Sequence, residues 1–199
     1  MKVRKLALSI LALALVGGAT AGASEAVQYF KGKQVRVEVN GKPIDGGGLQ
    51  IDGEIYLPVR ALTGTLQALI RSDADGLHID KPNAHLLVLM TRPKNASTPL
   101  AGKLNLTTYE FSVLVQVDNM RTNVHSTKVA IFDPAGEVLD EQVVLNESNE
   151  IRKEFMYITN PFKIHFRSAG DYKVRFYIKQ SKDSDYELIS EKAIVAEKE

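Results

Sequence analysis

The chain contains no cysteine and no tryptophan among its 199 residues. Without cysteine it has no disulfide bond, no thiolate metal ligand, no cysteine nucleophile and no N-terminal cysteine for lipid attachment. A chain of this kind depends on its hydrophobic core for stability, which is feasible at this length. An exported protein without disulfides is more typical of bacteria than of a eukaryotic secretory route.

An excess of one charge is also missing. The chain has 25 Lys plus Arg against 24 Asp plus Glu, a formal net charge of +1, and its basic residues are scattered among acidic ones. Nucleic-acid-binding domains usually concentrate basic residues on one face or in one stretch. The sequence therefore predicts no nucleic-acid partner.

The N-terminus has the pattern of an export signal. Residues 2–5 include three basic side chains, residues 6–16 are almost wholly apolar, and residues 21–23 are small. The apolar run is shorter than the about 20 residues of a membrane span, which disfavours an N-terminal anchor. We therefore predict a signal peptide over 1–23, a secreted or cell-wall-associated protein, and no membrane span in the mature chain. Removal of the signal leaves 22 Lys plus Arg against 24 Asp plus Glu, a formal net charge of −2.

The first folded part begins with an alternating strand and two turn signals. In Gln34–Asn40, valines alternate with polar residues, which predicts a half-buried strand. The dipeptides Asn40-Gly41 and Asp52-Gly53 favour two-residue hairpin turns, because both turn positions require a positive φ. We expect short strands around each turn.

A short helix is predicted after Pro58, because proline is tolerated where a helix begins. Val59, Leu62 and Leu66 recur at helical spacing, and Gly64 weakens the helix locally. Arg60, on the first turn, is predicted either to pair with Asp73 or a backbone carbonyl, or to be solvated.

The remainder of this part is predicted to be strands. Leu69–Asp73 leaves the helix as a strand, and Leu77–Asp80 and His85–Met90 form a closing hairpin around Pro82. The simplest assembly is a small α+β module, residues 33–91, in which one helix packs across a sheet.

These motifs resemble the copper amine oxidase N-terminal-like domain, also called the stalk domain. That family combines a V-x-N-G-K turn, a D-G-x-x-Y-V-P helix entry followed by arginine, and an L-G-A-x-V-x-W-D exit. The chain departs at Gln67, where the family usually has glycine, and at Ser72, where it often has tryptophan. The positions that match are Val39, Asn40, Gly41, Lys42, Asp52, Gly53, Tyr56, Pro58, Arg60, Ala61, Leu62 and Asp73.

The resemblance implies a scaffold and not an activity. In copper amine oxidases this module is a non-catalytic appendage, and most relatives occur in secreted or wall-associated bacterial proteins. The oxidase needs a quinone-forming tyrosine after asparagine, whereas the nearest sequence here is Thr108-Tyr109-Glu110, and it needs three copper-binding histidines. The four histidines are dispersed at His78, His85, His125 and His165. We therefore predict no enzyme, no catalytic residue, no cofactor and no metal site.

The second half is predicted to be an all-β, Ig-like sandwich over 103–196, after a polar, proline-containing linker at 92–102. Tyr109–Val117 alternates over a long strand, and further short strands follow with turn signals between them. Ala169–Val174 is typical of a tyrosine corner, in which the Tyr172 hydroxyl bonds back to the chain.

Other groups have a structural and a functional interpretation. Asp73 and Asp75 form part of a calcium-loop pattern, but without its terminal glutamate a plain turn is favoured, and the same holds for Asp183–Glu187. The aromatic residues of the strands either form a sugar- or peptide-binding face or fill the core, and the core is favoured. They are Tyr29, Phe30, Tyr56, Tyr157, Phe162 and Tyr177.

The leading hypothesis is a secreted, non-catalytic bacterial protein that serves binding or assembly at the cell surface or cell wall. Its partner would be a protein or a cell-wall polysaccharide. The alternative is a secreted enzyme inhibitor or accessory subunit that acts through sandwich loops such as Asp118–Ser126. An unpaired sandwich edge would point to strand-addition binding. The scaffold motif comprises Asn40, Gly41, Asp52, Gly53, Tyr56, Pro58, Arg60, Asp73 and Tyr172.

Overall fold

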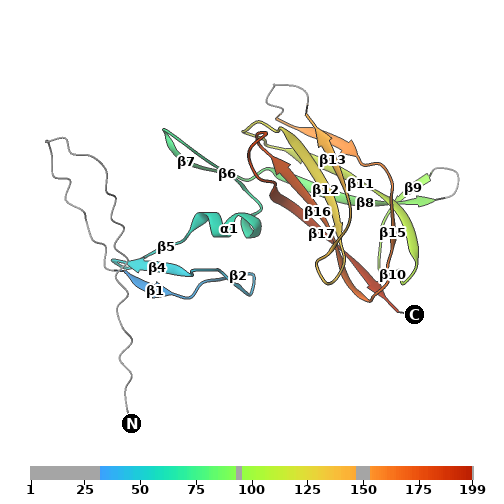
Figure 1. The fold of residues 1–199 in the computed structure, drawn as a ribbon, viewed down its shortest axis with the longest axis horizontal. Helices are drawn as coiled ribbons and strands as arrows, with labels where there is room; N and C mark the ends of the chain where they lie inside the picture. Colours follow the sequence, from blue (N-terminus) through green and yellow to red (C-terminus); the bar gives the residue numbers. More distant parts are fainter. Residues whose placement is uncertain (1–31, 93–95, 147–152, 199) are drawn as a thin grey trace, which may run out of the picture.

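The computed structural model describes residues 32–92, 96–146 and 153–198. Within these ranges the chain is mainly β-strand with one short helix (Figure 1). The predicted signal peptide at 1–23, and Tyr29 and Phe30, lie outside the described residues. In the described part, no helix is long and apolar enough to cross a membrane.

The N-terminal part forms three small antiparallel sheets and the helix α1. One sheet has the strand order β1-β4-β5, and the other two are the hairpins β2-β3 and β6-β7. The elements are β1 (Lys33–Val35), β2 (Glu38–Val39), β3 (Lys42–Pro43), β4 (Gly48–Ile51), β5 (Glu54–Tyr56), α1 (Val59–Leu66), β6 (Leu69–Asp73) and β7 (Gly76–Asp80).

Both predicted hairpin turns are confirmed. Asn40 and Gly41 have φ values of 53° and 75°, and Asp52 and Gly53 have 49° and 89°. Positive φ at both central residues is the requirement of the two-residue turn whose twist matches that of its strands. The first turn connects β2 to β3, and the second connects β4 to β5.

Helix α1 begins as predicted and ends in a left-handed residue. Pro58 is its N-cap, with an extended backbone, and Leu62 is its buried residue. Gln67 closes the helix with φ 53° and ψ 52°, and its N–H donates to the carbonyl oxygen of Thr63. Glycine adopts this conformation at no steric cost, so glutamine is an unusual residue at this helix end.

The second half is a β-sandwich of two sheets. Sheet I has the order β10-β17-β16-β12-β13, and sheet II has the order β14-β11-β8-β9. β15 pairs with the first part of β11, on the same edge that β14 pairs with farther along. Their strands are β8 (Asn83–Arg92), β9 (Ala96–Pro99), β10 (Leu104–Asn105), β11 (Thr108–Asp118), β12 (Ser126–Phe132), β13 (Val138–Leu145), β14 (Phe155–Ile158), β15 (Phe162–His165), β16 (Gly170–Lys179) and β17 (Glu187–Glu197).

The two sheets bury one hydrophobic core. Phe111, Val113 and Val115 of β11 are fully buried, and Val174 and Phe176 face them from β16. The alternation predicted for β11 is confirmed, since its intervening residues are exposed or half-buried. The β-sandwich is therefore the dominant folded body.

The tyrosine-corner bond is present at the start of β16. The Tyr172 hydroxyl accepts hydrogen bonds from the backbone N–H groups of Arg167, at 3.0 Å, and Ser168, at 3.2 Å. Its ring is 1% exposed and contacts Phe166, with the centroids 4.5 Å apart. Tyr172 thereby ties the turn before β16 to the core.

The predicted closing hairpin and linker are wrong. β7 pairs with β6, whereas β8 pairs with β11 and β9 inside the sandwich. Pro82, expected in a turn between two paired strands, is buried between β7 and β8. Because β8 supplies Val88 and Met90 to the sandwich core, and because β9 lies within 92–102, the sandwich begins at β8.

The expected packing of the helix across a sheet is also wrong. The main neighbours of α1 are β17 of the sandwich and β6, and in Figure 1 α1 lies between the β1-β4-β5 sheet and the sandwich. Leu69 of β6 is 1% exposed and belongs to the sandwich core. The start of β6 is thus docked on the sandwich and is not part of an independent module core.

Candidate functional site

The residues of the predicted scaffold motif do not converge on one site. Asn40-Gly41 and Asp52-Gly53 occupy separate turns, and Tyr56, at the end of β5, is 57% exposed. Pro58 caps α1, and Tyr172 lies in the sandwich core. The two turns, Pro58 and Tyr172 have local structural roles, and no cleft brings the motif residues together within the described residues.

Asp73 does not pair with Arg60. Its carboxylate contacts the guanidinium of Arg71, lies 3.0 Å from Nε2 of His78 and accepts the Asp75 N–H at 3.0 Å. The last bond closes the turn between β6 and β7, as the turn interpretation requires. Arg60 is exposed, with no salt bridge to a described residue.

No group of three or more His, Cys, Asp or Glu that could hold a metal ion occurs in the described part of the chain. Of the acidic run Asp183–Glu187, Glu187 points to the junction with β6. Its Oε2 lies 3.4 Å from the Ile70 N–H and 3.1 Å from Nε2 of Gln180. Burial raises the pKa of Glu187, and its hydrogen bonds with Ile70 and Gln180 and the charge of Arg60 counteract this.

The aromatic residues considered for a binding face are dispersed. Phe162 is fully buried in the core, Tyr157 faces the space between the sheets, and Tyr177 lies on the outer face of sheet I, where Lys128 approaches its ring. Tyr56 belongs to the N-terminal sheet. The described members of the set therefore form no common face.

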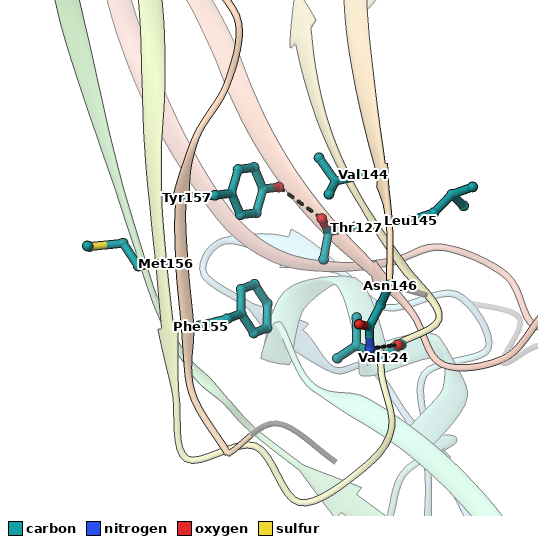
Figure 2. A pocket seen from close by; sticks show the side chains of 8 residues that line it. All are labelled: Val124, Thr127, Val144, Leu145, Asn146, Phe155, Met156 and Tyr157. Atoms are coloured by element: carbon teal, nitrogen blue, oxygen red, sulfur yellow. Dashed lines mark hydrogen bonds between the residues drawn. The ribbon is translucent and has the colours of Figure 1, made fainter. Parts of the chain in front are cut away.

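One side of the sandwich is open around the facing parts of β13 and β14, and farther along it Nε2 of Gln142 donates to the Asn160 carbonyl at 3.0 Å and bridges the two sheets. β13 is an edge strand of sheet I and β14 is an edge strand of sheet II, and a cavity of about 150 Å³ lies between them. In Figure 2, Phe155 and Tyr157 point from β14 into this space, and Met156 points away from it. The cavity is lined by Val124, Thr127, Val144, Leu145, Asn146, Phe155, Met156 and Tyr157.

The polar groups inside the cavity are already paired. The hydroxyls of Thr127 and Tyr157 lie 2.9 Å apart, and Nδ2 of Asn146 donates to the Val124 carbonyl at 2.8 Å (Figure 2). Burial raises the pKa of Tyr157, and its hydrogen bond with Thr127 partly counteracts this. The cavity is thus suited to an apolar group, since about 150 Å³ accommodates a group the size of benzene.

The backbone of β13 alternates between bonded and unbonded positions. The Asn146 N–H donates to the His125 carbonyl at 2.9 Å, and the pairing with β12 continues without a register shift as far as Ile131. In an antiparallel ladder every second residue bonds to the neighbouring strand. Val144 and Gln142, two and four residues from Asn146, therefore bond to β12.

The intervening residues Glu141, Val143 and Leu145 direct their N–H and C=O groups away from β12, along the free edge. The Glu141 N–H is covered by Oδ1 of Asp140 at 2.8 Å. Val143 and Leu145 are 48% and 63% exposed. In the described residues β13 has no strand partner other than β12.

The outer face of sheet I carries an ionic cluster around Glu191. Its carboxylate lies 2.6 Å from Nζ of Lys173 and 2.7 Å from Nε of Arg175. Burial raises the pKa of Glu191, but the hydrogen bonds and charges of Lys173 and Arg175 outweigh it and lower the pKa overall. Arg175 also stacks on Phe132, 4.5 Å from the ring centroid. The single carboxylate thus bridges two cations in a structural ion-pair network.

The sequence did not predict the open side of the sandwich or the contact between Glu187 and Ile70 of β6. The sequence predicts short strands after Tyr109–Val117, but whether a strand lies at an edge depends on long-range pairing that no local pattern shows. A usable signal was present: the apolar residues Val143, Val144 and Leu145 are consecutive, so they cannot all face one core.

Comparison with protein-family models and with curated proteins found no match to this chain.

Proposed function

We propose that this chain is a secreted, non-catalytic bacterial protein that binds another protein at the cell surface or cell wall. The observation that carries the proposal is the open side of the sandwich, where a free strand edge borders an apolar cavity. Exposed backbone groups beside pockets for alternate side chains are the elements of strand-addition binding. A polysaccharide is the less suitable partner, because the cavity is lined mainly by apolar side chains.

A non-catalytic role is supported by the surroundings of the carboxyl and phenol groups with shifted pKa values. Glu187, Glu191 and Tyr157 are each hydrogen-bonded to structural neighbours, and they lie on different parts of the fold. Enzyme sites usually gather perturbed groups in one cleft. The three groups here have roles in docking and packing that explain their shifts.

We infer that the N-terminal part is a divergent stalk-type domain. Support comes from its two positive-φ turns, the helix start after Pro58 and the left-handed residue at Gln67, where the family has glycine.

We infer further that the sandwich is Ig-like. Its support is the Tyr172 corner at the start of β16, together with the short strand β10, which pairs in parallel with β17 at the edge of sheet I.

The functional test uses the tagged mature chain with the culture medium and the cell-wall fraction of the producing bacterium. Retention on the cells through a protein partner, lost after protease treatment of the wall fraction, is the expected result. Retention that survives protease and is lost after glycan digestion would instead identify a polysaccharide partner. Turnover of a small-molecule substrate that is abolished by one point substitution would overturn the non-catalytic assignment.

The inhibitor alternative is favoured by one observation on the Asp118–Ser126 loop. Met120 and Thr122 are buried and anchor the loop, and the Met120 N–H donates to the Lys153 carbonyl at 3.0 Å. Arg121 is exposed between them. A preorganised loop loses little conformational entropy on binding. Recovery of one stoichiometric hydrolase from the medium, with loss of binding for Arg121→Ala, would favour this function.

A further inference from the structure

The free edge of β13 and the cavity beside it are arranged for the same occupant. A strand placed along Glu141–Leu145 would find the outward N–H and C=O groups of Val143 and Leu145 available for pairing. Alternate side chains of such a strand would point between the sheets, as Val144 does. One of them would enter the cavity of about 150 Å³ between β13 and β14.

The cavity accepts an apolar side chain without leaving polar groups unpaired. Thr127 and Tyr157 satisfy each other, and no buried side-chain polar atom in the described residues lacks a hydrogen-bond partner. A leucine entering this space would remove apolar surface from water at both partners, which favours the complex.

The charges along β13 define the occupant further. Glu137 and Asp140 are exposed and have no salt bridge to a described residue, whereas Glu141 pairs with Lys128 at 3.2 Å. A basic side chain opposite Asp140 would therefore meet an uncompensated carboxylate. A second copy of β13 is disfavoured, because antiparallel self-pairing centred on Val143 would place Asp140 opposite Asn146, which supplies no cation to compensate its charge.

We propose that β13 binds an extended segment of a partner protein by antiparallel strand addition, with one apolar side chain in the cavity and a lysine or arginine opposite Asp140. This inference rests on the proposed protein-binding function and specifies the chemistry of the partner. The antiparallel direction follows from the greater stability of antiparallel pairs and from their greater frequency in proteins.

The test is a titration of the ¹⁵N-labelled mature chain with a synthetic peptide, acetyl-Ser-Val-Leu-Val-Thr-Lys-Lys-amide. In antiparallel register its leucine lies opposite Val144 and its lysines lie opposite Glu141 and Asp140. We expect saturable binding, with the largest amide shifts at Val143 and Leu145. Three control peptides have alanine for leucine, glutamate for both lysines, or N-methyl groups on the two valines, and each should weaken binding about tenfold or more.

Two substitutions in the protein test the same site without changing the peptide. Val143→Pro removes an outward N–H and leaves the ladder to β12 intact, and Val144→Phe fills the cavity. Both should weaken binding of the parent peptide about tenfold, which corresponds to 1.4 kcal/mol. Val138→Phe, on the same strand but outside the cavity lining, is the matched control and should leave affinity unchanged.

Several results would overturn the proposal: no saturable binding, binding that the N-methylated peptide retains, shifts located away from β13, or dimerisation of the chain through β13. The Val144→Phe variant and the peptide controls keep the test decisive if Val143→Pro fails to fold. None of these results would affect cell-surface retention in the functional test, so failure of this inference is distinguishable from failure of the proposed function.

Discussion

Tyr172 carries the clearest single-residue contribution to the fold. Its hydroxyl accepts two backbone N–H bonds, and its ring is buried against Phe166. The local motif was enough to predict this bond, since a tyrosine at the start of a late sandwich strand has a recurrent partner a few residues upstream.

Tyr172→Phe should destabilise the chain by about 1–3 kcal/mol, because the N–H groups of Arg167 and Ser168 lose their acceptor while the ring packing stays. Urea unfolding monitored by circular dichroism measures the change. Tyr56→Phe, on an exposed ring, is the control and should have an effect near zero. Equal stability of the two variants would contradict the assigned role of the hydroxyl.

Glu187 and Glu191 predict opposite dependences of stability on pH. The folded-state pKa of Glu187 is raised, so its contribution is fully present below the unfolded pKa and is lost as the pH rises through the folded pKa. The folded-state pKa of Glu191 is lowered, so its contribution is present above the unfolded pKa and is lost as the pH falls through the folded pKa.

Glu187→Gln should therefore raise the free energy of unfolding at pH 7 by less than about 1 kcal/mol, after allowance for solvent screening, and have little effect near pH 4. The amide oxygen of the new side chain can still accept from Ile70 and Gln180. Glu191→Gln should lower stability at pH 7. Urea unfolding at both pH values measures the free energy of unfolding of the two variants. Changes of the same sign for both variants at pH 7 would contradict the opposite pKa shifts of Glu187 and Glu191.

At the scale of elements, the sequence predicted most strands but not all of their partners. The alternation of β11 and the turns at Asn40-Gly41 and Asp52-Gly53 arise from neighbouring residues, so local chemistry was sufficient. The partner of β8 depends on residues of β11, far along the chain. A hairpin with β7 was predicted because the two are adjacent, but Leu77 and Ile79 of β7 are about half exposed and offer β8 no core.

The same limit applies to β6. Its strand conformation was predicted, but its docking on the sandwich was not, because the bonds from Ile70 reach Glu187 and Gln180, more than 100 residues away. For the candidate site, the aromatic residue Tyr157 was named from the sequence, whereas its place beside a free edge follows only from the assembled sheets.

The docking of β6 predicts that its first residue stabilises the sandwich. Leu69→Ala should lower the free energy of unfolding by about 2–5 kcal/mol, because Leu69 is 1% exposed and lies in the sandwich core. Leu77→Ala in β7, where the side chain is 49% exposed, is the control and should cost less than about 1 kcal/mol. Loss of stability confined to the N-terminal part, with an unchanged transition for the sandwich, would show that β6 is not docked.

At the scale of the whole molecule, the chain combines a closed core with one open side. The core unites both sheets and the start of β6, whereas β13 and β14 leave their outer edges unpaired within the described residues. Proteins usually protect such edges with charged residues, and Asp140 and Glu141 serve that purpose on β13. The apolar residues Val143–Leu145 beside them remain exposed, which is consistent with an edge retained for binding.

Amide hydrogen exchange along β13 in the chain without ligand tests the central claim most directly. The N–H groups of Val144 and Gln142, bonded to β12, should be protected, and those of Val143 and Leu145, on the free edge, should exchange far faster. Addition of the peptide should then slow exchange at Val143 and Leu145. Equal protection of all four amides in the chain alone would mean that the edge is already covered, and would contradict a binding site on β13.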